Sequence, residues 1–260
     1  MRRSVDSIRF RVERRRWERQ NAAAWRGLKR AGGSTAASAL EAGFVLADQY
    51  RAWDSWSLDR TSIIWLAELL LQQEIKHIIE FGAGFSTLAL AGYLRQMLPE
   101  TSLMSFEHQP DYARRIQSFL PVDSQARVEC AELWQVDDLV FERLFTVPAP
   151  YSAFKAAATP VPVERYHETR LHNVFYEFDF EKIAAGTVDL IILDGPNGNG
   201  RSLAFPFLRH ALRLPGWLLI DDYLDYPFLD HCRKVFAADV IRHFEGGCKT
   251  YMLVRVVSHI

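Results

Sequence analysis

Acidic side chains stand at the ends of four short apolar runs that have the composition of buried strands. Glu80 lies near the end of KHIIEF, Glu107 ends SLMSFE, Asp194 follows VDLIIL, and the pair Asp221 and Asp222 follows WLLI. Short apolar runs rich in branched residues predict parallel strands that are covered on both faces. Because ligands of open α/β sheets bind at the carboxyl ends of the strands, we expect these carboxylates to share one site.

A glycine turn follows the first of these strands, within residues 76–94, KHIIEFGAGFSTLALAGYL. Gly82 and Gly84 allow a ligand to approach the backbone, and the free amides at the start of the next helix favour an anionic group. Ser86 and Thr87 offer helix-capping hydroxyls. Thr87 also occupies the third glycine position of a dinucleotide-binding G-x-G-x-x-G motif, so an NAD-linked oxidoreductase is the less favoured alternative. The carboxylate before the turn suits an ammonium or sulfonium better than a pyrophosphate.

In chain order, these segments of residues 61–257 resemble the class I S-adenosyl-L-methionine (SAM) methyltransferases, specifically an O-methyltransferase-like branch of that family. The matching motifs are E-F-G-x-G-x-S-T at 80–87, an acid at Glu107, D-G-P at 194–196 and D-D at 221–222. The resemblance implies a SAM-dependent methyltransferase whose glycine loop and Glu80 hold the methionine part of SAM. Glu107 would then accept hydrogen bonds from the ribose diol, and Glu132 would border the adenine.

The resemblance also bears on the methyl acceptor. The [D/N/S]-P-P-[Y/F] motif of amino methyltransferases is not matched, because Gly195 intervenes and Asn197 replaces the aromatic residue. We therefore expect O-methylation of a small molecule or sugar. Some O-methyltransferases hold a divalent cation through acids at the positions of Asp194, Asp221 and Asp222, which would suit Mg²⁺ or Mn²⁺. The alternative is that Asp221 and Asp222 only order a loop or hold the ammonium of the cofactor.

Histidines offer a second way to activate a hydroxyl group. An imidazole can act as a general base near neutral pH. Asp194 and Asp222 are the catalytic candidates of the metal mechanism, and the histidine candidates are His108 and His167, followed by His172 and His231. Each histidine can equally be a surface residue without a role.

The spacing of these strands predicts an α/β fold with a Rossmann-like class I methyltransferase sheet. We expect this sheet to be mostly parallel with an antiparallel edge strand, helices on both faces and an N-terminal helical extension. Residues 1–38 are expected to form a basic arm and linker, and residues 39–260 the SAM-binding domain. An irregular insert at about 134–185 interrupts that domain, and its aromatic content favours a cover over the substrate rather than disorder.

Charge is unevenly distributed along the 260 residues. Residues 1–30 carry 11 Lys or Arg and three acids, about +8, which leaves 20 Lys or Arg and 29 acids, about −9, in residues 31–260. The arm can be solvated, or it can bind an anionic membrane, a nucleic acid or an acidic partner. A homo-oligomer is also possible. A non-catalytic SAM- or nucleotide-binding module that docks through the arm remains an alternative function.

Three widely spaced cysteines, Cys130, Cys232 and Cys248, form no C-x-x-C pair. This pattern is typical of reduced thiols. The sequence contains no apolar run long enough to span a membrane. We therefore expect a cytoplasmic protein that is at most peripheral to the membrane.

Overall fold

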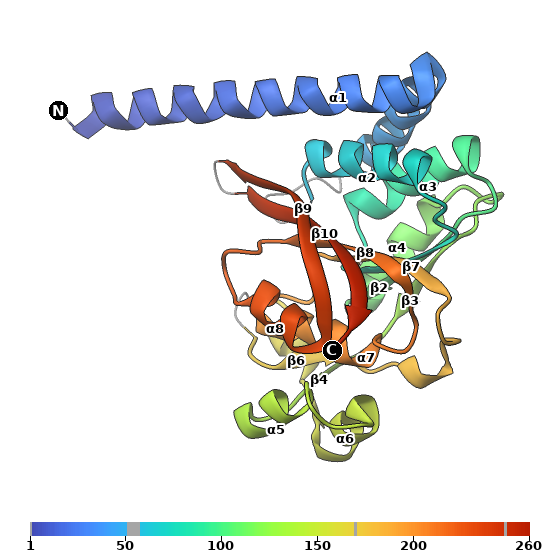
Figure 1. Cartoon of the computed structure of the whole chain (residues 1–260), viewed down its shortest axis with the longest axis vertical. Helices are drawn as coiled ribbons and strands as arrows, with labels where there is room; N and C mark the ends of the chain where they lie inside the picture. Colours follow the sequence, from blue (N-terminus) through green and yellow to red (C-terminus); the bar gives the residue numbers. More distant parts are fainter. Residues whose placement is uncertain (1, 51–57, 169–170, 247–248) are drawn as a thin grey trace.

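The computed structural model describes residues 2–50, 58–168, 171–246 and 249–260 (Figure 1). Within these residues, seven strands form the main sheet. Their spatial order is β3 (Ala126–Cys130), β2 (Ser102–Glu107), β1 (His77–Phe81), β7 (Val188–Leu193), β8 (Leu212–Asp221), β10 (Lys249–His259) and β9 (Phe236–Gly246). Neighbouring strands from β3 to β8 are parallel, and β10 is antiparallel to both β8 and β9. The predicted fold class is therefore confirmed, with a β9–β10 hairpin at the edge.

Strand β1 lies at the centre of the sheet because it can be covered on both faces. Ile79 pairs with Met104 of β2 on one side and with Ile191 of β7 on the other. Alternation along the strand sends Ile79 and Phe81 into one hydrophobic cluster and Ile78 into a second cluster on the opposite face. Glu80 shares the face of Ile78, a placement that determines its role in the site.

Helices cover both faces of the sheet. The core on the first face contains residues of α1 (Arg2–Gln49), α2 (Arg60–Gln72), α3 (Phe85–Met97) and α4 (Pro110–Phe119). The second face carries the 3₁₀ helix η3 (Asn199–Leu203), α7 (Ala204–Phe207), α8 (Phe228–Val235) and the insert. None of the helices in the described ranges is both long enough and apolar enough to cross a membrane.

Helix α1 changes the expected domain boundary. It continues from Arg2 to Gln49 with a kink at Gly33 (φ 68°), so the boundary predicted at residue 38 falls inside a helix. Ala24 and Leu28 are buried in the first-face core. The prediction of a separate arm and linker is therefore wrong for this part, because small and apolar residues between the charges pack on the domain. Only the first turns of α1 extend past the body of the molecule (Figure 1).

The insert is a packed subdomain and not an irregular segment. Its three-stranded sheet has the order β5 (Thr159–Pro160), β4 (Leu133–Gln135), β6 (Val174–Tyr176), with α5 (Asp138–Arg143), α6 (Pro150–Ala157), η1 (Val163–Arg165) and η2 (Phe180–Lys182) around it. Phe154, Phe175 and Phe180 are completely buried and pack around Phe207 of α7. The aromatic residues therefore form a core, which fixes the loops of the insert beside the strand ends.

Candidate active site

Glu80 supports the glycine loop from within the protein. Its side chain is completely buried beneath α3. Oε1 accepts a hydrogen bond from Ser86 Oγ, and Oε2 accepts from Thr87 Oγ1 and Ser105 Oγ, each at 2.5 Å. Thr87 Oγ1 in turn accepts a hydrogen bond from the backbone N–H of Gly84 at 2.8 Å. The acid and its hydroxyl partners thus fix the shape of the turn.

Gly82 allows two strand ends to touch. Its φ of +96° lies in the region that favours glycine, and a Cβ there would lie 2.9 Å from the backbone nitrogen of Gly195. A Cβ on Gly195 would lie 2.7 Å from the Tyr176 hydroxyl and 2.9 Å from Gly82 Cα. Side chains at either position would separate the loops, so the G-x-G and D-G-P motifs form one continuous surface.

A cleft of about 440 Å³ opens at the carboxyl ends of β1, β2 and β7. Its lining consists of residues 82–85, 107–109 and 194–197, with Tyr112, Tyr166, His167 and Tyr176. The structure therefore brings together six predicted residues: Gly82, Gly84, Glu107, His108, His167 and Asp194. Glu80, Ser86 and Thr87 do not line the cleft, because their polar atoms are bonded to one another behind the loop.

Glu107 ends β2 and is 5% exposed. Its Oε1 accepts hydrogen bonds from the backbone N–H groups of His108 and Gln109, at 2.9 and 2.8 Å. Burial raises the pKa of Glu107 to about 7, although these two hydrogen bonds oppose the shift. The carboxylate therefore has a fixed orientation, with Oε2 free of these two bonds.

His108 is held against Glu107. Its Nδ1 lies 3.2 Å from Glu107 Oε1 but has no hydrogen-bond partner among the described residues, because the alignment is poor. Burial lowers the pKa of His108 to about 4, so the imidazole is neutral at pH 7. Its ring packs edge-on against Tyr166, with centroids 5.1 Å apart. A neutral, packed imidazole beside a carboxyl group serves as a wall of the cleft.

Asp194 and Tyr176 present buried polar atoms without partners. Asp194 Oδ1 and the Tyr176 hydroxyl make no hydrogen bond within the described part of the chain. Burial raises the pKa of Asp194 to about 6, against the opposing charge of Arg201. Burial, together with the charge of Asp194, raises the pKa of Asp221 well above its usual range. The two carboxyl groups therefore disfavour each other's ionisation, and Asp194 is the one that lines the cleft.

The predicted three-aspartate metal site is not formed. Asp222 has φ 51°, and its Oδ2 lies 3.6 Å from Nη1 of the buried Arg201. Lys249 Nζ lies 3.7 Å from Asp221 Oδ2. Within the described ranges, no group of three His, Cys, Asp or Glu side chains is arranged to hold a metal ion. Arg201 and Lys249 lie beside Asp222 and Asp221 instead. Arg201 also connects the D-D pair to the D-G-P loop, because its Nε donates a hydrogen bond to the Pro196 carbonyl at 2.8 Å.

Three other candidates lie away from the cleft. Glu132 is exposed, and only its backbone carbonyl is engaged, by the N–H of Glu177 at 2.8 Å. His172 is exposed and its carbonyl accepts from Gln135. His231 is buried, with Nδ1 2.8 Å from Ser202 Oγ and its ring near Phe145. The adenine role of Glu132 and the base roles of these histidines are therefore not supported by position. Cys248 lies outside the described residues.

Tyr176 is one of the cleft residues that the sequence motifs do not predict, together with Tyr112 and Tyr166. It reaches the cleft through long-range pairing, in which β6 places Tyr176 opposite Leu133 of β4. The loop after β7 fits tightly against the same insert, because a Cβ on Gly200 would lie 1.7 Å from the Val174 carbonyl oxygen. No local sequence pattern predicts either contact. The aromatic content of the insert was the one feature of the sequence that pointed to this region.

Comparison with known proteins gives a likeness of fold. No family model and no curated protein matches the chain. An O-methyltransferase from Bacillus cereus, solved in complex with SAH, is 14% identical with a TM-score of 0.49, covering 85% of this chain and 91% of that one. A precorrin-6y C5,15-methyltransferase from Geobacter metallireducens is 14% identical with a TM-score of 0.46, covering 80% and 94%. The order and directions of the strands in the main sheet are those of a Rossmann-like fold, and the reaction must be inferred from the cleft.

Proposed function

We propose that this protein is a SAM-dependent methyltransferase. The observation that supports the proposal most strongly is the pair of carboxyl groups, Glu107 and Asp194, on the two sides of the glycine loop in one cleft. SAM carries a ribose diol, an ammonium and a sulfonium, so it needs hydrogen-bond acceptors and negative charge at separate points. A dinucleotide would instead bring a pyrophosphate to the glycine loop, next to Asp194, where the negative charges would repel each other.

Glu107 is the proposed ribose ligand. It stands at the end of the strand after the glycine loop, and its orientation is fixed by two backbone N–H groups. A carboxylate held in this way can accept charge-assisted hydrogen bonds from two adjacent hydroxyls. The glycine loop would contribute free amides and close backbone approach at Gly82 and Gly84.

Asp194 is the proposed partner of the cofactor ammonium, in place of Glu80. Asp194 lines the cleft and its buried Oδ1 makes no hydrogen bond within the described residues, whereas Glu80 is occupied by three hydroxyl groups. A buried carboxyl group that lacks a full set of hydrogen bonds gains from a cationic partner. The ammonium of the cofactor would be such a partner for Asp194.

SAM supplies a methyl group that is already activated by the sulfonium. The residues of this chain then have to orient an acceptor and take up its proton. We propose an oxygen of a small molecule or sugar as the acceptor, with Asn197 and Tyr176 as hydrogen-bonding groups beside it. His167 is the proposed base, because it lines the cleft while the ring of His108 is packed against Glu107 and Tyr166. Mg²⁺ and Mn²⁺ are not part of the proposal, since the aspartates do not form a ligand set.

Transfer of radiolabelled methyl from SAM to a panel of hydroxylated small molecules and sugars tests the function. We expect one class of acceptor to be labelled with formation of SAH. The His167→Ala variant should lose most of its kcat, on the order of 10²-fold or more, while its affinity for SAH is retained. His108→Ala is the matched control, with a smaller loss in kcat. SAM binding without transfer to any acceptor would favour the non-catalytic module instead.

A further inference from the structure

We propose that the outer face of α1 docks this protein on an anionic membrane surface. The docking surface consists of four cationic side chains, called here the basic stripe: Arg15, Arg19, Arg26 and Lys29. All four side chains are exposed. None of them forms an ion pair with another residue of the described ranges, so their charges are available to a partner.

The inner face of the same helix contacts the body of the protein. Trp17 Nε1 donates to Asp59 Oδ2 at 3.1 Å, and Asn21 Nδ2 donates to Thr61 Oγ1 at 3.0 Å. Ala24 and Leu28 are buried one and two turns further along. With 3.6 residues per turn, these four positions lie on one side of α1 and the basic stripe lies on the opposite side.

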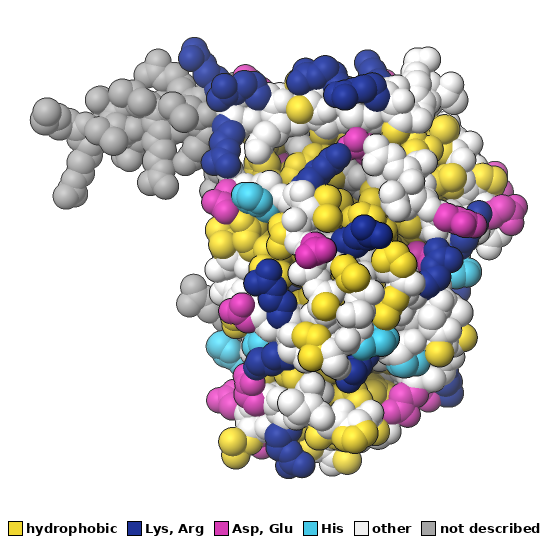
Figure 2. Space-filling model, in the orientation of Figure 1, with side chains coloured by type: hydrophobic (Ala, Val, Ile, Leu, Met, Phe, Trp, Pro, Cys, Tyr) yellow, Lys and Arg dark blue, Asp and Glu magenta, His cyan; other side chains and the backbone are white. Residues whose placement is uncertain are grey.

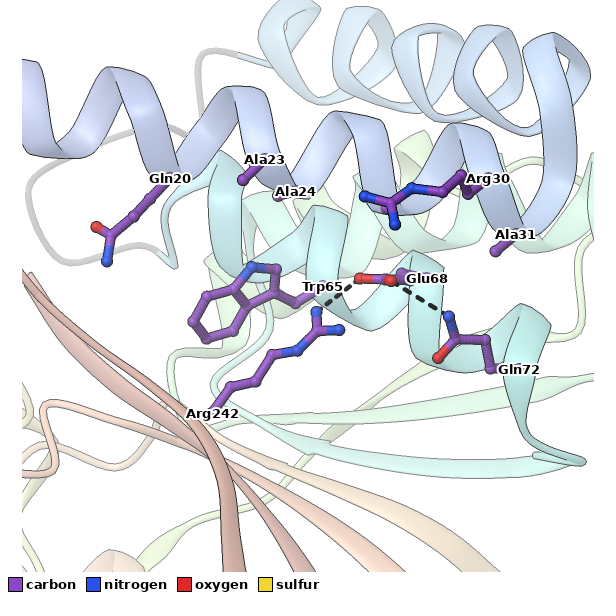
Figure 3. Close-up of a pocket in the computed structure, with 10 residues that line it drawn as sticks. Gln20, Ala23, Ala24, Arg30, Ala31, Trp65, Glu68, Gln72 and Arg242 are labelled. Atoms are coloured by element: carbon purple, nitrogen blue, oxygen red, sulfur yellow. Dashed lines mark hydrogen bonds and ion pairs between the residues drawn. The ribbon is translucent and has the colours of Figure 1, made fainter.

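Contact with α2 fixes this orientation of α1. Figure 3 shows small residues of α1, including Ala23 and Ala24, above Trp65 and Glu68 of α2. Glu68 is paired with Arg242 of β9 at 2.6 Å, and a Cβ on Gly27 would lie 2.7 Å from its Oε1. Rotation of α1 about its axis would bring long side chains against this ion pair. The basic stripe is therefore directed away from the body.

The basic stripe is long, straight and close to free of acids. Arg15 and Lys29 are 14 positions apart, about 21 Å along a helix axis. Figure 2 shows Lys and Arg side chains along the α1 edge of the molecule, in the described part of the helix. Glu18 is the only acid among residues 15–30. The helix continues to Arg2, and residues 2–14 add five arginines and two acids to its sequence.

A flat anionic surface fits the basic stripe better than a nucleic acid does. Residues 31–260 carry a net charge of about −9, which would repel a flexible polyanion long enough to reach the body. A membrane would contact only the outer face of α1 and would stay one helix diameter away from the acidic body. This distance is about the Debye length at physiological salt, so the repulsion would be largely screened. Aromatic residues for base stacking are also missing from the outer face of residues 15–30, since Trp17 bonds to Asp59 and Trp25 packs on Phe44.

Because the described outer face presents charges and few large apolar side chains, docking should be electrostatic with little insertion. Co-sedimentation of the full chain with phosphatidylcholine vesicles, with and without phosphatidylserine, tests this. The protein should bind only the vesicles that contain phosphatidylserine. Binding at about 0.1 M salt should be lost at about 1 M.

Four substitutions in the basic stripe, Arg15→Gln, Arg19→Gln, Arg26→Gln and Lys29→Gln, should together weaken vesicle binding about tenfold or more. Glutamine keeps a high helix propensity, so α1 should persist in the circular dichroism spectrum. The matched control removes the same charge from exposed body residues, Arg114→Gln, Arg127→Gln, Lys182→Gln and Arg233→Gln, and should bind as the wild type does.

Three results would overturn the proposal. The first is a wild-type protein that does not bind vesicles containing phosphatidylserine at low salt. The second is equal weakening by the stripe and control variants, which would indicate an effect of net charge alone. The third is a wild-type protein that binds an RNA duplex more tightly than vesicles at equal phosphate concentration, or that forms a dimer by light scattering which the stripe variant loses.

Discussion

Three carboxyl groups at neighbouring strand ends differ in what surrounds them, and this decides what each can do. Glu80 is enclosed by three hydroxyl donors, Glu107 is held by two backbone N–H groups at the cleft, and Asp194 has an oxygen with no partner. A buried acid whose bonds are all made within the protein stabilises a loop, whereas one with a free oxygen at a cavity can receive a ligand.

Glu80→Gln should destabilise the protein in the absence of any ligand. Oε2 accepts from both Thr87 and Ser105, and an amide NH₂ at that position would face two donors. We expect a loss in the free energy of unfolding of about 1–3 kcal/mol by urea denaturation. Asp194→Asn is the matched control, which should cost little because no such bonds are lost. Unchanged stability of Glu80→Gln with lost SAM affinity would return Glu80 to the role of cofactor ligand.

The raised pKa of Glu107, about 7, predicts a pH-dependent stability. Between its ordinary pKa and about 7, the folded protein binds a proton that the unfolded chain releases. The free energy of unfolding should therefore fall as pH rises through this window, by on the order of 3 kcal/mol from this group.

Glu107→Gln removes the ionisation, so the variant should be more stable than the wild type at pH 8 and equal to it near pH 5. Urea denaturation of the ligand-free proteins at both pH values measures this difference. Glu132→Gln, at an exposed position, provides the control and should follow the wild type. A difference between Glu107→Gln and wild type that is the same at both pH values would contradict the raised pKa.

At the scale of elements, the crossing of α1 and α3 depends on a glycine. A Cβ on Gly43 would lie 2.3 Å from the Ala89 carbonyl oxygen, and a Cβ on Gly92 would lie 2.9 Å from Gly43 Cα. Gly43→Leu should force the helices apart and lower the free energy of unfolding by about 1–3 kcal/mol or more. Ala42→Leu adds the same side chain at an exposed neighbour and should have little effect. Equal stability of the two variants in thermal denaturation would show that the crossing is looser than described.

The central strands could be predicted from sequence because burial on both faces leaves a simple composition. Residues 188–193 were expected as a strand and are β7, with all six residues buried. The apolar run that begins at Ser102 was also expected to be a strand, and it is β2. The sequence does not predict the orientation of the Glu80 side chain, because this orientation depends on hydroxyl groups of α3 and β2.

Helix α1 and the insert were misjudged for two different physical reasons. In α1, the many arginines concealed the apolar residues, such as Ala24 and Leu28, that pack on the domain. The hydrophobic residues of the insert show no regular period in the sequence. Its aromatic side chains pack against residues far away in the sequence, as Tyr151 does against Phe207. A local hydrophobic pattern predicts a helix or strand whose buried residues recur with a regular period or that is buried on both faces. Neither α1 nor the insert has such a pattern.

At the scale of the whole molecule, the N-terminal helix should be part of the folded unit. Deletion of residues 1–30 removes the Trp17–Asp59 and Asn21–Thr61 hydrogen bonds and the buried Ala24 and Leu28, so it should lower the Tm by several degrees or more. Deletion of residues 1–14 removes none of these groups and should leave the Tm nearly unchanged. Equal Tm values for the two truncations would support the separate arm that the sequence suggested.

The central claim is that the cleft binds SAM through Glu107, and titration calorimetry with SAM, SAH and NAD tests it most directly. We predict that SAM and SAH bind and that NAD does not. Glu107→Ala should weaken SAM binding by about 2–4 kcal/mol through the lost ribose contacts, while Glu132→Ala, outside the cleft, should bind SAM as the wild type does. Tight binding of NAD, or unchanged SAM affinity in Glu107→Ala, would contradict the assignment of the cleft.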